Sequence, residues 1–167
     1  MTTTAELMTM LRSYLDAQRQ HVLGILDGLD NVALLRPVLP SGWSCAGLVQ
    51  HLALDVERFW FRCVVGGEQQ AIDSLDAIDD AWQVAEDVTP TRVLQLYRDE
   101  VDRADTVLAE ASPDQPPAWW PQDLFGDWRM QDLRQVILHV TVETACHAGH
   151  LDAARELIDK RQWMVLG

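Results

Sequence analysis

Apolar residues recur at helical spacing in four long stretches of the chain, which are separated by segments rich in proline, glycine and acidic residues. Spacings of three, four and seven residues place apolar side chains on one face of a helix. No stretch alternates apolar with polar residues in the way a half-buried strand does. We therefore expect an all-α protein, a four-helix bundle with longer connections between the helices.

The ends of the predicted helices carry recognisable capping residues. Ser44 is a favoured N-cap for the second helix, and Thr89-Pro90 is a cap followed by proline at the first helical position. Prolines exclude a helix between residues 113 and 121, and the acidic segment 68–88 reads as a connection with a short helical turn within 73–82. The four predicted helices cover about residues 4–28, 44–66, 89–111 and 129–159.

Length and composition indicate an ordinary folded protein. The 167 residues suit a single domain over 1–167, large enough for its own hydrophobic core. A hydrophobic content of 48% with 23% charged residues is typical of globular rather than disordered chains. No apolar run approaches the roughly 20 residues that span a bilayer, and the N-terminal residues do not resemble a signal peptide. We therefore expect a cytoplasmic protein.

The net charge limits the possible binding partners, and the number and spacing of the cysteines limit the possible disulfides. A net charge of −13 repels phosphate backbones and anionic lipids, so we expect neither nucleic-acid nor membrane partners. The three cysteines form no Cys-x-x-Cys pair and are odd in number, which argues against a disulfide framework. Each is expected to be a small buried side chain: Cys45, Cys63 and Cys146.

The last predicted helix carries four side chains that can bind a metal: His139, Glu143, His147 and His150. At about 100° per residue they fall within an arc of about 80°, on the side of the helix that also carries the apolar stripe. Polar groups buried there without partners cost about 1–3 kcal/mol each. A metal ion would satisfy several of them at once.

Glu143 and His147 are four residues apart, a spacing that lets two helical side chains converge on one ion. A third ligand should come from another helix, where His51 is the remaining inward-facing histidine, since His21 is expected to be exposed. Two histidines and one carboxylate suit Zn²⁺, Fe²⁺ or Ni²⁺ and leave positions open for water or substrate. Spacing alone leaves an alternative, in which these side chains, His139 among them, bond only to neighbouring protein groups.

The two ligand-bearing segments resemble a known family. Ser44-Cys-Ala-Gly-Leu-Val-Gln-His51 and Glu143-Thr-Ala-Cys-His147-Ala-Gly-His150 are similar to the DinB-like (YfiT-like) superfamily of metal-binding four-helix bundles. Within it the chain resembles, over nearly its whole length, the mycothiol-transferase branch long catalogued as a domain of unknown function. The resemblance implies His51, Glu143 and His147 as the metal ligands, and His150 as a residue that supports a ligand or contacts substrate.

At the site the chain also resembles the N-terminal domain of mycothiol-dependent maleylpyruvate isomerase. That enzyme has a second domain for which this chain has no room, so the isomerase reaction is not expected. The resemblance instead implies a metal-dependent thiol S-transferase that adds a mycothiol-like thiol to a small electrophile through a metal-bound thiolate. Zinc is the expected metal, with Ni²⁺ or Fe²⁺ as alternatives, and Asp55 or His150 could orient a ligand or move a proton.

Other functions and contacts stay open at this point. The metal could activate water in a small-molecule hydrolase, or the bundle could bind metal without turnover as a stress-associated protein. A homodimer is one assembly open to such a bundle. Trp43, Trp119 and Trp120 are candidates for substrate contact, against the alternative that their rings cap the bundle ends.

Overall fold

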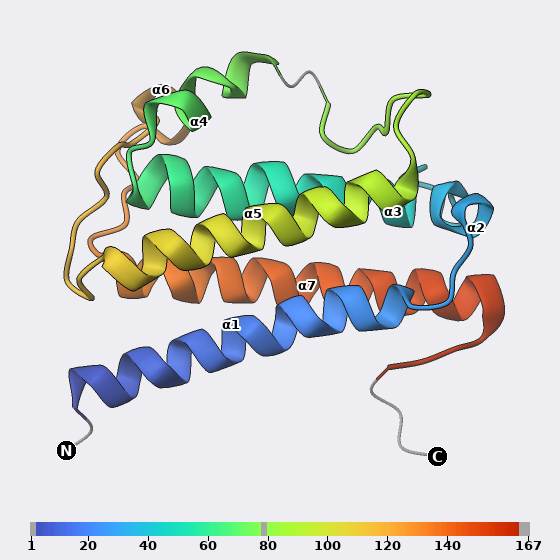
Figure 1. Ribbon diagram of the computed structural model, residues 1–167, viewed down its shortest axis with the longest axis horizontal. Helices are drawn as coiled ribbons and strands as arrows, with labels where there is room; N and C mark the ends of the chain where they lie inside the picture. Colours follow the sequence, from blue (N-terminus) through green and yellow to red (C-terminus); the bar gives the residue numbers. More distant parts are fainter. Residues whose placement is uncertain (1–2, 78–79, 164–167) are drawn as a thin grey trace.

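The computed structural model describes residues 3–77 and 80–163, and within these ranges all regular structure is helical (Figure 1). The expected all-α bundle is confirmed. The helices, in chain order, are α1 Thr4–Leu26, α2 Asn31–Leu35, α3 Cys45–His51, η1 Leu52–Val65, α4 Gln69–Asp73, η2 Leu75–Ala77, α5 Pro90–Glu110, α6 Gln122–Phe125 and α7 Leu133–Asp159.

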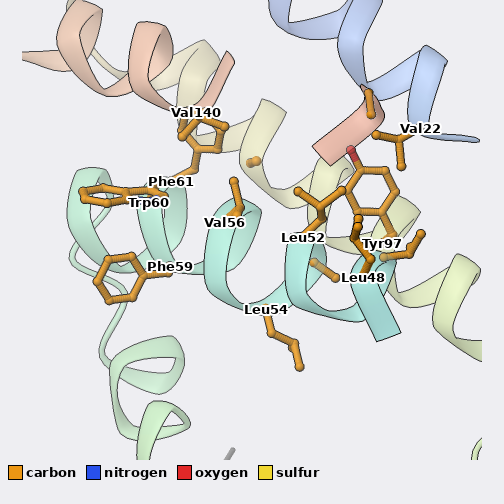
Figure 2. Packing of buried hydrophobic residues seen from close by; sticks show 14 of the residues in the cluster. Val22, Leu48, Leu52, Leu54, Val56, Phe59, Trp60, Phe61, Tyr97 and Val140 are labelled. Carbon is orange, nitrogen blue, oxygen red and sulfur yellow. The ribbon is translucent and has the colours of Figure 1, made fainter. Parts of the chain in front are cut away.

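Four long helical segments form the bundle: α1, α3 with η1, α5 and α7 (Figure 1). α1 packs along α7, η1 packs against α5 and α7, and α3 packs against α5. Figure 2 shows side chains from these segments converging, with Leu52 near Tyr97 and Val22, and Val56 below Val140. All five side chains are almost fully buried.

The predicted capping residues explain where the long helices begin. The side chains of Ser44 and Thr89 accept hydrogen bonds from the backbone N–H groups of Gly47 and Arg92. The last helix begins later than the expected Arg129, at Leu133, because Asp132 caps it.

The second long segment changes its hydrogen-bond register after His51. α3 continues without a break into η1, where the backbone bonds are of the wider π type, and the N–H of Gly66 still donates to the carbonyl of Phe61 at 2.9 Å. His51 and Asp55, four residues apart on this continuous segment, lie on neighbouring turns and are in contact.

The connections contain short helices that the periodicity did not predict. α2, α4 and α6 lie in segments expected to be loops. The helical turn expected within 73–82 is present in part, as η2; residues 78–79 lie outside the described part of the chain.

Buried ion pairs tie the long segments together. Arg19 of α1 donates two hydrogen bonds to the Glu57 carboxylate of η1, at 2.8 and 2.6 Å. Glu100 of α5 is fully buried and accepts hydrogen bonds from Arg58 and Arg62 of η1. These contacts fix η1, which begins next to His51, against α1 and α5.

Two expectations about single side chains are wrong. Cys146 is exposed because it lies on the outer side of α7, although Cys45 and Cys63 are buried as expected. His21 is buried rather than exposed, with its Nε2 atom 2.9 Å from Asp152 and its ring stacked on Trp163. Among the described helices, none combines the length and the apolar character needed to cross a membrane.

Candidate metal centre

Three of the predicted ligands come together between the second and the last long segments. His51 at the end of α3 and Glu143 and His147 of α7 each offer one ligand atom, and these atoms all lie within 4.8 Å of one another. Each residue is half-buried. We call these three residues the metal triad. The hydrogen bonds and ring contacts around these three residues indicate whether the triad can hold a metal ion.

His51 is oriented as a metal-ligating histidine would be. Its Nδ1 atom lies 2.8 Å from Oδ2 of Asp55, so the ring donates its N–H to this carboxylate. The Nε2 atom then carries a lone pair, and it is buried with no hydrogen-bond partner among the described residues. A carboxylate that fixes the tautomer from behind is the usual support of a metal-bound histidine. The unpartnered Nε2 therefore fits a metal ion.

Glu143 supplies the negative charge of the triad. Its Oε1 atom lies 3.7 Å from Nε2 of His147, and its Oε2 atom lies 3.6 Å from Nε2 of His139. His147 first, and then His139 and His51, hold the pKa of Glu143 below its ordinary value despite its partial burial. The carboxylate is thus ionised at neutral pH. One carboxylate and two imidazoles are a donor set that zinc and other divalent transition metals accept.

The two other histidines of α7 lie beside the triad. Nδ1 of His150 is 3.4 Å from Nδ1 of His147, and the His150 side chain is exposed. The ring of His139 packs edge-on against Trp60, with ring centroids 4.6 Å apart, and burial lowers its pKa. Neither residue contributes an atom to the group of three neighbouring ligand atoms. A supporting or substrate-contacting role for His150 stays a prediction.

A tryptophan from the connection before α5 covers the triad. The Trp82 ring stacks on His51 with centroids 4.2 Å apart and meets His147 edge-on at 5.6 Å. Gln50 holds this segment by donating hydrogen bonds to the carbonyls of Ala81 and Gln83, at 2.9 and 3.0 Å. Sequence reasoning missed Trp82, and its only signal was a tryptophan within an acidic connection.

Gly47 is what lets the Trp82 backbone come so close to α3. A Cβ atom at residue 47 would lie 2.1 Å from the carbonyl oxygen of Trp82, far inside van der Waals contact. The absence of a side chain at Gly47 thus allows the Trp82 backbone to pack against α3. A small residue on α3 therefore contributes to the position of the ring that covers His51.

An aromatic cavity of about 390 Å³ adjoins the triad at Glu143. It shares Glu143 with the triad and Asp55 with the support of His51. Its remaining lining residues come from η1, from α6 and its following loop, and from α7: Phe59, Trp60, Leu124, Phe125, Trp128 and His139. Sequence reasoning gave these lining residues no part in the site, except His139.

The tryptophans predicted to contact substrate lie near the site but do not line this cavity. Trp120 packs behind the cavity wall against Trp60 and Phe125, with centroids 6.0 and 5.6 Å away, and Trp119 packs against Phe59. Trp43 lies against Trp82 and His150 instead. Substrate contact by these rings stays a prediction.

Comparison with known proteins identifies the family of this chain. The profile of the mycothiol-S-transferase family matches residues 10–160, a range that contains the whole triad. No curated protein and no solved structure gives a significant match. The chain belongs to the mycothiol-S-transferase family.

Proposed function

We propose that the protein is a metal-dependent S-transferase that joins mycothiol, or a closely similar small thiol, to a small electrophile. Membership of the mycothiol-S-transferase family supports the thiol and the type of reaction. The observation that carries the metal dependence is the buried, unpartnered Nε2 atom of His51, within reach of Glu143 and His147. The proposed metal is zinc.

The metal triad would hold the ion and leave a position for the sulfur. A divalent metal bound there lowers the pKa of a coordinated thiol, so that the thiolate forms near neutral pH without a dedicated base. Asp55 fixes the imidazole of His51, and Trp82 shields that ring from water. The protein thus contributes orientation and a dry environment.

The transfer needs only the thiol and the electrophile. The thiol loses its proton, and the exposed His150 beside His147 is placed to pass that proton to water. The sulfur electron pair forms a bond to an electrophilic carbon. A leaving group on that carbon departs with the electrons of its own bond, so charge and atoms balance.

Thiol titration of the cobalt-loaded protein tests this proposal. Mycothiol should produce a sulfur-to-cobalt absorption band that saturates at one thiol per metal, whereas its S-methylated form, which cannot ionise, should not. Metal-dependent hydrolysis without any response to thiol would contradict the proposal and favour a hydrolase. Bound metal with neither response would favour a metal-binding protein without turnover.

A further inference from the structure

We propose that the aromatic cavity beside Glu143 binds the electrophile, and that it selects flat, uncharged aromatic molecules over carboxylated ones. This inference rests on the proposed S-transfer, because it assigns the second substrate of the same site. The cavity volume of about 390 Å³ falls within the range of small-molecule pockets.

The shape of the walls favours a planar ligand. Trp60 and Phe125 are nearly parallel, with centroids 5.7 Å apart and planes 20° from each other. Trp128 meets Trp60 edge-on, with their planes 87° apart. A ligand ring could stack on the face of one of these rings or meet another edge-on. These are the two arrangements that aromatic pairs prefer. A ligand ring can adopt either arrangement with these aromatic side chains, whereas a flexible aliphatic chain can adopt neither.

Two large apolar side chains at this cavity are left uncovered. Leu124 is 70% exposed and Trp128 is 49% exposed, and both line the cavity. Exposed apolar groups gathered at one concave site mark ligand or partner binding, unlike single scattered ones. A ring seated in the cavity would cover these two side chains.

The charges around the cavity disfavour a carboxylated ligand. None of its lining residues is an arginine or a lysine, and its acidic residues are Asp55 and Glu143. Once Glu143 and the thiolate have balanced the two charges of the proposed metal, a ligand carboxylate placed among the aromatic rings would lose its water without gaining a cationic partner. The cavity thus discriminates by charge as well as by shape.

The position of the cavity suits carbon–sulfur bond formation. Glu143 belongs both to the metal triad and to the cavity lining, so a ring in the cavity lies next to the place where the thiol sulfur would bind. The sulfur pair forms a bond to a ring carbon or ring-conjugated carbon, and the leaving group takes the electrons of the bond that breaks. The electrophile class is therefore an uncharged aryl or aryl-conjugated compound with a leaving group.

Calorimetric titration without thiol tests the inference apart from turnover. The probes are 1,3-dinitrobenzene and 3,5-dinitrobenzoate, which differ by one carboxylate. The protein without bound metal, whose open position would otherwise bind the benzoate carboxylate, should bind dinitrobenzene saturably and the benzoate at least about tenfold more weakly. The variant Leu124→Ala/Trp128→Ala should lose at least about tenfold in dinitrobenzene affinity. The matched control Leu138→Ala/Leu157→Ala, at exposed apolar residues of α7 outside the cavity, should bind normally.

A His147→Ala variant separates this inference from the proposed function. It should lose the thiol response and still prefer dinitrobenzene to the benzoate, because the cavity does not include His147. Equal affinity for the two probes, or unchanged binding in the Leu124→Ala/Trp128→Ala variant, would overturn the aromatic cavity whatever the thiol response. Selective ring binding in a protein that never responds to thiol would support the cavity and overturn S-transfer instead.

Discussion

His51 and Asp55 form the contact on which the candidate metal centre depends. The carboxylate of Asp55 holds Nδ1 of His51 at 2.8 Å and so keeps Nε2 free for an ion. Sequence reasoning named both residues, but it could not show that they touch. The contact joins residues four apart where α3 continues into η1, and their spacing permits the contact without requiring it.

Replacing Asp55 with alanine should weaken metal binding by about 10–100-fold, because His51 loses the group that fixes its tautomer and its ring. Competition with a chromophoric chelator measures the affinity. The matched control is Asp152→Ala, which removes a similar carboxylate 2.9 Å from His21, away from the triad. Equal affinities in the two variants would show that Asp55 does not support the centre.

Gly47→Ala should disturb the site through Trp82. The added methyl group must displace a backbone carbonyl 2.1 Å away, and overpacking of this kind costs about 1–3 kcal/mol of stability. The control Gly149→Ala adds the same group to α7 with nothing within 4 Å, so it should be neutral or gain up to about 1 kcal/mol. Chemical denaturation measures both changes, and equal midpoints for the two variants would contradict this account of Gly47.

The three thiols should react in order of burial. Burial raises the pKa of Cys45 to about 11 and that of Cys63 to about 11, so both remain protonated at pH 8, where only thiolates react. Cys146 is exposed. Iodoacetamide at pH 8 should therefore add one group to the native protein and three after unfolding, as intact-mass spectrometry would show. Rapid addition of a second group to the native form would contradict the burial of Cys45 and Cys63.

At the scale of elements, α7 was the easiest to predict and the connections were the hardest. Glu143 and His147 share a face of α7 because a regular helix repeats its geometry, so their spacing carries the information. Trp82 and Phe125 come from connections, and their positions depend on contacts with distant residues such as Gln50 and Trp60. Local sequence patterns do not reveal such contacts.

The contact of α1 with η1 depends on a buried ion pair. Arg19 and Glu57 have side chains only 5% and 1% exposed. Arg19→Met would leave the buried carboxylate without its cation, which should cost about 3–5 kcal/mol of unfolding free energy. The control Arg19→Met/Glu57→Leu removes both charges and should recover most of the loss. Urea denaturation measures both, and a double variant no more stable than the single one would contradict this reading.

The pH dependence of the Arg19→Met variant has a definite sign. Burial raises the pKa of Glu57, and without Arg19 the opposing effect of the guanidinium is lost. An acid whose pKa is higher in the folded state than in the unfolded state loses stability as the pH rises above its ordinary range. The penalty of the variant should therefore shrink on acidification, measured as the difference from wild type at each pH.

For the molecule as a whole, the two long connections flank the same centre. The connection between η2 and α5 brings Trp82 over His51, and the connection between α5 and α7 brings Phe125 and Trp128 to the cavity. The bundle supplies the metal ligands, and its connections supply the aromatic surroundings. The site thus explains why these connections are longer than a minimal bundle needs.

The sequence allowed the bundle class and all three members of the triad to be predicted, because both rest on helical periodicity and on the family resemblance. The aromatic cavity could not be predicted, since its walls come from η1, α6 and α7, which lie far apart in the sequence. Phe59 and Trp60 are buried apolar side chains, yet they also line the cavity. Periodicity identifies a buried ring but not the space beside it.

The most direct test of the central claim is the metal content of the purified protein, measured by mass spectrometry after loading with zinc and removal of free ions. Wild type and a His139→Ala control should retain about one ion per chain. His147→Ala should retain almost none, because it removes a triad ligand, whereas His139 contacts Glu143 from outside the triad. Equal metal in all three proteins, or none in the wild type, would contradict a metal centre built from His51, Glu143 and His147.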